Sequence, residues 1–215
     1  MRIGLFGGTF NPIHRGHLLL AEGAERILKL DEVWFIPAHL PPHKGVEGQV
    51  SAEERARMVE LAIQGNPRFR LCRAELDRPA PSYTIDTVRQ LQRERPGFGK
   101  RRPRGLAPFS PPLVKKCLTP FPGMEWFFLV GSDTARDLST WREAEELMKR
   151  VRFIAIPRPG TAGRTPLPAG VLEIPVETAD LSSSLLRERL RRGDPLADSI
   201  PEPALAYIRQ RGLYR

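Results

Sequence analysis

Two histidines, His14 and His17, follow a glycine-rich turn near the start of the chain. Both belong to the run GGTFNPIHRGH at 7–17, which lies between an apolar segment at 3–6 and the apolar start of a predicted helix at 18–22. Glycines in such a turn let main-chain N–H groups approach an anion, and a following helix N-terminus adds partial positive charge. Imidazoles three residues apart share one helix face and can donate to the same phosphate. The run therefore indicates a site for a nucleoside triphosphate.

The run differs from the two commonest glycine loops. It lacks the Gly-Lys-Ser/Thr of a P-loop and the three spaced glycines of a dinucleotide-binding loop. It instead resembles the His-x-Gly-His signature of the nucleotidyltransferase superfamily, and the longer string GGTFNPIHRGH resembles the bacterial nicotinate-nucleotide adenylyltransferase family in particular. The resemblance implies that ATP is bound by Gly7, Gly8, Thr9, Phe10, His14 and His17. It also implies that Thr9 and Asn11 contact the second substrate. A glycine turn with two surface histidines is the alternative.

A second phosphate motif occurs near the other end of the chain. The string LSSSLLR at 181–187 resembles the family's Ile-Ser-Ser-Thr-x-Ile-Arg signature. Hydroxyls and N–H groups at a helix start, with an arginine one turn in, suit phosphates approached from the side opposite the histidines. The resemblance implies that Ser183, Ser184 and Arg187 contact ATP. A simple N-cap with a surface arginine is the alternative.

A lysine follows the second predicted strand. Lys44 closes the segment PPHK, which places it in a loop beside the first motif. A lysine there is a mobile point charge suited to a phosphate. The resemblance implies that Lys44 also contacts the acceptor substrate, and that His14, His17, Lys44 and Arg187 are the catalytic set. An exposed lysine without a role is the alternative for Lys44.

The tripeptide Gly131-Ser132-Asp133 ends another apolar run and resembles the family's Gly-x-Asp at the adenosine end. The resemblance implies that Gly131 admits adenosine close to the main chain, with Asp133 nearby as an acceptor or helix cap. An ordinary strand-to-helix cap is the alternative.

Two segments resemble the acceptor-binding parts of the same family. The string PSYTIDT contains Tyr83 and Thr84, and the string STW ends at Trp141. The resemblance implies that the Trp141 ring packs on the pyridine of nicotinate mononucleotide, with Tyr83 and Thr84 near its carboxylate. Arg142 stands where many family members have tyrosine, and we hypothesise that it pairs with that carboxylate. Core packing is the alternative for Trp141.

The elements that must position these residues alternate along the chain. Short apolar runs predict strands and periodic apolar segments predict helices. Strands are predicted at 3–6, 33–38, 69–73, 126–130, 153–156 and 171–174, and helices at 16–29, 51–65, 83–95, 144–150, 184–192 and 203–211. Ser51 with Glu54, and Thr140 with Glu143, predict capping boxes. This rhythm predicts an α/β fold, a Rossmann-like doubly wound parallel sheet of nucleotidyltransferase type with helices on both faces.

The composition predicts one domain over residues 1–215, because this length suits a single core. No apolar run could span a bilayer, and Met1-Arg2 leads straight into the first strand, so we expect no membrane segment or signal peptide. Cys72 and Cys117 lack metal-ligand spacing, which favours a reducing, cytoplasmic location. The sequence leaves open whether the chain forms a homo-oligomer.

The basic charge is concentrated in one segment. Residues 97–121 hold five prolines, six Lys or Arg and no acidic residue, and so account for six of the nine net positive charges. Compared with the family pattern, this segment is an insert placed within a short Pro-Gly turn. We favour a surface loop on its composition. A contact for an acidic partner or nucleic acid is the alternative.

Taken with the resemblance, these features predict adenylyl transfer in NAD biosynthesis. The phosphate of nicotinate mononucleotide would attack the α-phosphorus of ATP in line, giving nicotinate adenine dinucleotide and pyrophosphate without a covalent enzyme intermediate. Mg²⁺ would arrive with ATP and need no dedicated protein site. A sister enzyme that adenylates nicotinamide mononucleotide or phosphopantetheine is one alternative, and a nucleic-acid-binding or scaffold protein that uses the 97–121 insert is another.

Overall fold

Six parallel strands form the centre of the protein. The structure, a computed structural model, describes residues 1–40, 50–94, 124–157, 166–176 and 179–215. The strands are β1 (Arg2–Gly8), β2 (Glu32–Pro37), β3 (Phe69–Leu71), β4 (Glu125–Gly131), β5 (Arg152–Ile156) and β6 (Leu172–Glu173). Their order is β3-β2-β1-β4-β5-β6, and every neighbouring pair is parallel. The order reverses between β1 and β4, which confirms the predicted doubly wound sheet.

The register brings the carboxyl ends of the central strands to one edge of the sheet. Gly8 of β1 pairs with Pro37 of β2, and Gly131 of β4 pairs with Ile156 of β5. In sheets of this order, ligands bind outside the carboxyl ends where the order reverses. The edge at β1 and β4 is therefore where a site is expected.

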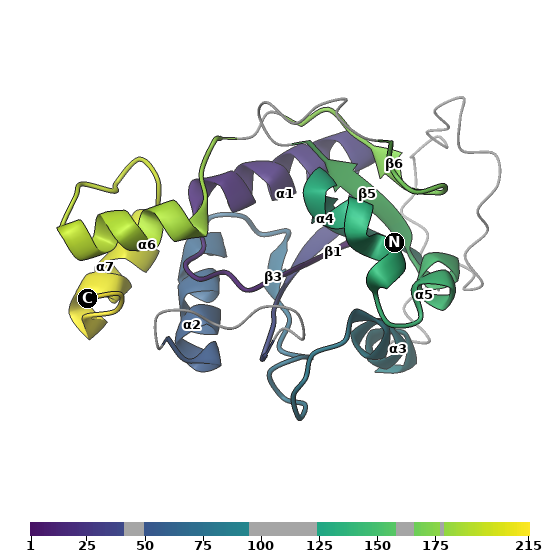
Figure 1. Cartoon of the computed structure of the whole chain (residues 1–215), viewed down its shortest axis with the longest axis horizontal. Coiled ribbons are helices and arrows are strands. Elements are labelled where there is room, and N and C mark those ends of the chain that lie inside the picture. The colour runs from purple at the N-terminus through teal and green to yellow at the C-terminus, as the bar shows by residue number, and fades with distance from the viewer. Residues whose placement is uncertain (41–49, 95–123, 158–165, 177–178) are drawn as a thin grey trace.

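Helices cover both faces of the sheet, as predicted (Figure 1). They are α1 (Arg15–Leu28), α2 (Ala52–Ile63), α3 (Thr84–Glu94), α4 (Ser132–Arg136), the 3₁₀ turn η2 (Asp137–Thr140), α5 (Ala144–Arg150), α6 (Ser183–Arg192) and α7 (Glu202–Arg211). Helix α7 packs on α2 at one end of the molecule, and α3 packs on α5 at the other.

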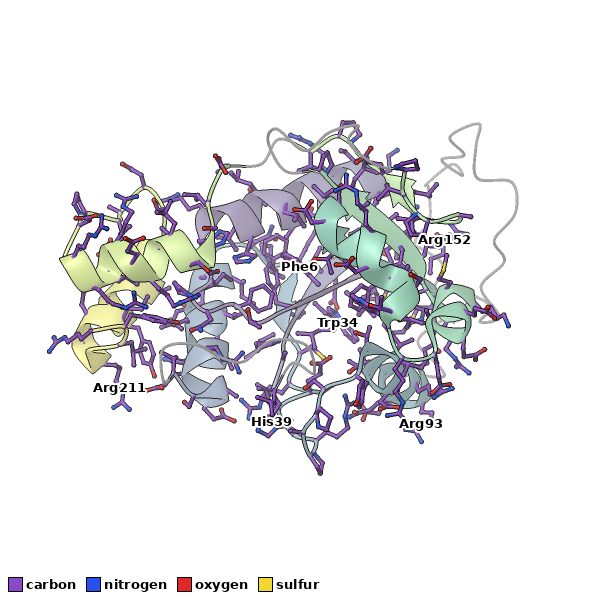
Figure 2. All side chains as sticks on the ribbon, viewed as in Figure 1. Phe6, Trp34, His39, Arg93, Arg152 and Arg211 are labelled. Atoms are coloured by element: carbon purple, nitrogen blue, oxygen red, sulfur yellow. The ribbon has the colours of Figure 1, made fainter. Side chains whose placement is uncertain are left out.

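The alternation of side chains along the strands creates two apolar cores. Phe6 and Phe127 belong to the core that α1, α2, α6 and α7 cover. Trp34 and Phe128 belong to the core that α3, α4 and α5 cover. Figure 2 shows Phe6 and Trp34 in the interior of the molecule. Because both faces are packed, the segments that follow the strands start from fixed positions.

One predicted capping box forms and the other does not. Ser51 and Glu54 form the box at the start of α2, where each side chain accepts a bond from the other residue's main-chain N–H. The predicted box of Thr140 and Glu143 is wrong. Thr140 ends the turn η2, and its hydroxyl donates within that turn. Glu143 itself precedes α5, in a left-handed conformation with φ of 52°, and its carboxylate pairs with Arg89.

Two predicted features lie outside the described residues, namely Lys44 and the insert at 97–121. The surface loop predicted for the insert therefore stays a prediction. Within the described ranges, no helix is both long and apolar enough to cross a bilayer.

Candidate active site

A cleft of about 1060 Å³ opens at the carboxyl ends of β1, β4 and β5. Residues from distant parts of the chain line it. The predicted site residues among them are Gly7, Gly8, Thr9, Asn11, His14, His17, Tyr83, Thr84, Gly131, Asp133, Trp141, Arg142, Ser183, Ser184 and Arg187. A cleft where separate motifs converge at a topological switch point is the usual place for a ligand.

The two histidines begin helix α1 and stack on each other. His14 is the N-cap residue and His17 the third helical residue, with ring centres 3.7 Å apart. Nδ1 of His17 accepts a hydrogen bond from the main-chain N–H of His14 at 3.2 Å. Because Nδ1 is the acceptor, the neutral ring carries its proton on Nε2. His17 also lines the cleft, and its predicted contact with a phosphate stays a prediction.

Gly16, between the two histidines, lies where a larger side chain would clash. A Cβ at Gly16 would lie 3.0 Å from Nδ1 of His14, tighter than nearly all real contacts. The missing side chain lets the buried His14 ring lie against the first turn of α1. On the other side, the ring of Phe10 meets His17 edge-on, with centres 5.1 Å apart. Packing therefore holds both imidazoles in place.

The turn between β1 and α1 folds back on itself at Phe10. This residue has φ of 46°, a left-handed conformation that costs a non-glycine residue about 1–2 kcal/mol. Its ring lies on Gly8, where a Cβ would come within 3.0 Å of a ring carbon. The side chain is only 1% exposed and faces the core. If Phe10 contacts ATP as predicted, its main chain makes that contact, because its ring faces the core.

Helix α6 is tied to this turn by side-chain hydrogen bonds. The Ser183 hydroxyl donates to the carbonyl of Pro12 at 3.1 Å. The buried Arg187 guanidinium donates to the carbonyl of Asn11 at 2.9 Å and to the Ser184 hydroxyl oxygen at 3.2 Å. The fold therefore brings the second phosphate motif beside the first. Their individual contacts with ATP stay predictions.

The segment after α7 also holds the turn. The Tyr214 hydroxyl donates to Oδ1 of Asn11 at 2.6 Å, and both side chains are buried. Asn11 is thus oriented by a residue far away in the sequence. Tyr214 could not be found from the sequence, since a single tyrosine beyond the last helix carries no motif.

The residues after β4 form the opposite wall. Gly131 is the N-cap residue of α4, and Asp133, in the first turn of that helix, pairs with Arg136 at 3.0 Å. Asp133 lines the cleft and remains a candidate acceptor. Other residues that line the cleft and were not predicted as site residues include Ile156, Pro157, Ala179 and Asp180. Ile156 and Pro157 end the strand β5, so the rule that ligands bind at strand carboxyl ends could have found them.

The start of α3 meets Trp141 and Arg142 at one end of the cleft. Trp141 is half-buried and packs on the second core while it lines the cleft. The Arg142 guanidinium lies 4.7 Å from the centre of the Tyr83 ring and 3.7 Å from the Asp86 carboxylate. Thr84 is the first residue of α3, so a helix N-terminus and a cation face the same space. This end of the cleft suits a flat ring that carries an anionic group.

A buried carboxyl group lies beneath the start of α3. Glu75 lines the cleft and was not proposed from the sequence. Burial raises the pKa of the Glu75 carboxyl, while hydrogen bonds with Thr87 and Ser82 act in the opposite direction. The Thr87 hydroxyl donates to Glu75 at 2.8 Å and also contacts the carbonyl of Tyr83 at 3.2 Å. Glu75 therefore helps to position the residues that begin α3.

Fold and cleft together define a nucleotidyltransferase of the cytidylyltransferase-like class, whose family model matches residues 5–189. Curated relatives narrow the class. The chain is 39% identical over 213 residues to a Geobacillus kaustophilus protein, covering 99% of this chain and 86% of the relative. It is 40% identical over 216 residues to a Thermus thermophilus protein, covering both in full. Both relatives carry the name "Probable nicotinate-nucleotide adenylyltransferase". The chain belongs to the nicotinate-nucleotide adenylyltransferase family.

Solved structures agree on the fold. The Plasmodium falciparum nicotinic acid mononucleotide adenylyltransferase complexed with NaAD matches with a TM-score of 0.72 at 19% identity, over 99% of this chain and 97% of that one. The same enzyme complexed with APC matches with a TM-score of 0.69 at 18% identity, over 99% and 96%. At these identities the likeness supports the architecture alone.

Proposed function

We propose that this chain transfers the adenylyl group of ATP to nicotinate mononucleotide, giving nicotinate adenine dinucleotide and pyrophosphate for NAD biosynthesis. One observation carries the proposal: a single cleft joins the start of α1, the start of α6 and the start of α3. Helix N-termini attract anions. The first two would hold the triphosphate and the third would receive the nicotinate carboxylate. The names of the relatives support this choice of acceptor.

The chemistry follows from where charge moves. An oxygen of the acceptor phosphate forms a bond to the α-phosphorus while the bond to the bridging oxygen breaks, so negative charge accumulates on the departing pyrophosphate. The acceptor phosphate is already an anionic nucleophile, and the mechanism needs no covalent enzyme intermediate. Donors fixed around the triphosphate then supply most of the rate enhancement. In this proposal His14, His17 and Arg187 are those donors, and Lys44 joins them from the loop after β2.

Mg²⁺ enters this proposal as part of the ATP substrate. In the part of the chain that the structure describes, no group of three or more His, Cys, Asp or Glu side chains is placed to hold a metal ion. The residues around the triphosphate end are hydrogen-bond donors and an arginine, which fit phosphate oxygens that themselves carry the metal. Mg²⁺ keeps several waters and takes phosphate oxygens readily. When bound, it would neutralise the charge that develops on pyrophosphate.

The test is pyrophosphate release from ATP and Mg²⁺ with three acceptors in parallel: nicotinate mononucleotide, nicotinamide mononucleotide and phosphopantetheine. We expect kcat/KM to be highest for nicotinate mononucleotide. A higher value for either of the other acceptors would overturn the substrate assignment and leave the reaction class standing. No turnover with any of the three would overturn the proposed function.

A further inference from the structure

Arg55 is a buried cation that no motif singled out. It lies on α2, on the side of that helix that faces the sheet, and its side chain is only 1% exposed. The guanidinium donates to three main-chain carbonyls: Thr9 at 2.7 Å, Ala38 at 2.7 Å and His39 at 3.0 Å. Thr9 belongs to the turn after β1, and the other two follow β2. One side chain therefore joins the loops that leave two neighbouring strands.

The buried charge of Arg55 is met by main-chain carbonyls. Within the described ranges Arg55 forms no ion pair, and its Nε is buried with no acceptor. Burial lowers the pKa of the Arg55 guanidinium, yet an arginine stays protonated in proteins. A buried charge that only carbonyls solvate is costly for stability. The hydrogen bonds to the three carbonyls offset part of this cost.

The three carbonyls indicate a role for Arg55. The Thr9 carbonyl belongs to the peptide that joins Thr9 to Phe10, the residue in the left-handed conformation. This peptide is trans, so when its oxygen points toward Arg55 the N–H of Phe10 points the opposite way. Thr9 and Ala38 line the cleft. The main-chain N–H of His39 in turn donates to the Ser82 hydroxyl at 3.1 Å, which links this loop to the segment before α3. Figure 2 shows His39 on the side of the molecule where α2 and α3 lie.

We propose that Arg55 is a positioning residue for the adenylyl transfer, a clamp that fixes the phosphate-binding turn after β1 relative to Ala38 and His39, which follow β2. The inference rests on the proposed function for its reaction but on the three hydrogen bonds for its geometry. In-line transfer needs the two substrates aligned closely, and a misplacement of about 1 Å can cost roughly a hundredfold in rate. A planar fork that reaches carbonyls of both loops at once meets that need, and a lysine does not.

The experiment compares Arg55→Lys and Arg55→Ala with Arg57→Lys and Arg57→Ala. Arg57 lies on the same helix, is exposed and pairs with Glu60, so it controls for general effects on α2. Rates are expressed per folded molecule, with the folded fraction taken from near-UV circular dichroism below each melting temperature. We expect kcat of Arg55→Lys to fall about ten- to a hundredfold and both Arg57 variants to keep the wild-type kcat. Added methylguanidinium should restore part of the kcat of Arg55→Ala and leave wild type and Arg57→Ala unchanged.

Two results would overturn the clamp. One is a wild-type kcat and KM for both substrates in folded Arg55→Lys. The other is a loss of activity in both Arg55 variants that disappears once rates are corrected for the folded fraction. If Arg55→Ala does not fold, Arg55→Lys decides alone, because it keeps the charge and most of the side chain.

Wild-type turnover is measured first, so that failure of the proposed reaction is recognised separately. In that case calorimetric titration with ATP replaces turnover, and equal affinity of Arg55→Lys and Arg57→Lys would overturn the clamp.

Discussion

The end of the cleft proposed to hold the phosphates (the phosphate end) and the end proposed to hold the pyridine (the pyridine end) are built differently. At the phosphate end, carbonyls of the turn after β1 accept hydrogen bonds from side chains of α2 and α6, and His14 is almost fully buried. At the pyridine end, the Arg142 side chain is 53% exposed and lies 3.7 Å from Asp86. Exposed pairs of this kind contribute little to stability, about 0–1 kcal/mol.

The difference separates two tasks. Groups that meet the reacting phosphates must be fixed before substrates bind, because reorganisation during the reaction would raise the barrier. An exposed group near the acceptor ring, such as Arg142, can change without disturbing the core. Substitutions at the phosphate end should therefore lower kcat, and substitutions at the pyridine end should alter the choice of acceptor.

The largest effect is expected at His17. His17→Ala removes the Nε2–H donor and should lower kcat by about a factor of 10²–10³, the loss seen when one donor to a developing charge is removed. The melting temperature should also fall, because the variant loses the acceptor for the His14 main-chain N–H and the packing on Phe10. Steady-state kinetics with nicotinate mononucleotide, together with thermal unfolding, would measure both. A kcat within a few-fold of wild type would remove His17 from the catalytic set.

A smaller effect is expected when the histidines are displaced but kept. In Gly16→Ala the new methyl group pushes on the His14 ring, and kcat should fall by about tenfold or more. Alanine is the better helix former by roughly 1 kcal/mol, which offsets the contact, so stability should change little. Gly65→Ala is the control, since a Cβ there meets nothing within 4 Å. Equal kcat in the two variants would show that the first turn yields to the added methyl group.

At the pyridine end we expect a change of selectivity. Arg142→Ala should reduce the preference for nicotinate over nicotinamide mononucleotide by about tenfold, the value of one charge-assisted hydrogen bond. Thermal stability should not change. Arg89→Ala is the control, because that partly exposed arginine of α3 pairs with Glu143 and does not line the cleft. If Arg142→Ala keeps the wild-type selectivity, Arg142 does not pair with the nicotinate carboxylate.

The smallest effect concerns pH and Glu75. Burial raises the pKa of the Glu75 carboxyl in the folded state, so the folded protein binds this proton more tightly than the unfolded chain does. The stabilisation from that proton is complete below the unfolded pKa of about 4.3 and is lost as pH rises through the raised folded pKa. Glu75→Gln cannot titrate and should lack this component. Chemical denaturation of both proteins from pH 4 to 7 would compare the slopes, and identical slopes would contradict the assignment.

The sheet could be predicted because its strands are buried on both faces. A strand such as WFFLV in β4 is then a continuous apolar run, and the motifs that end such runs must meet at one edge. The motifs at 7–11 and 131–133 could be placed at the cleft for this reason, whereas the segments at 83–84, 141–142 and 181–187 were placed by their resemblance to the family. The capping box at Thr140 failed because a 3₁₀ turn ends there, and tertiary contacts rather than the local pattern decide where α5 begins.

Other site residues had no local signal. Arg55 was missed, because nothing in the sequence distinguishes this buried arginine from the exposed Arg57 two positions later on α2. The left-handed conformation of Phe10 was equally hidden, since its strain is stabilised by contacts from α1 and the sheet. Whether a side chain hydrogen-bonds to the main chain of a distant loop depends on three-dimensional packing. Residue type and spacing alone do not indicate it.

The hydrogen bond between Tyr214 and Asn11 joins residues 203 positions apart. A ribosome makes Asn11 early and Tyr214 late, at a pace of about 5–20 residues per second. During that interval the turn after β1 exists without the partners that α6 and Tyr214 later provide. During synthesis there is therefore a period in which the strands of the sheet can pair while the cleft is incomplete. The turn at 9–11 is fully supported only after Tyr214 has been made.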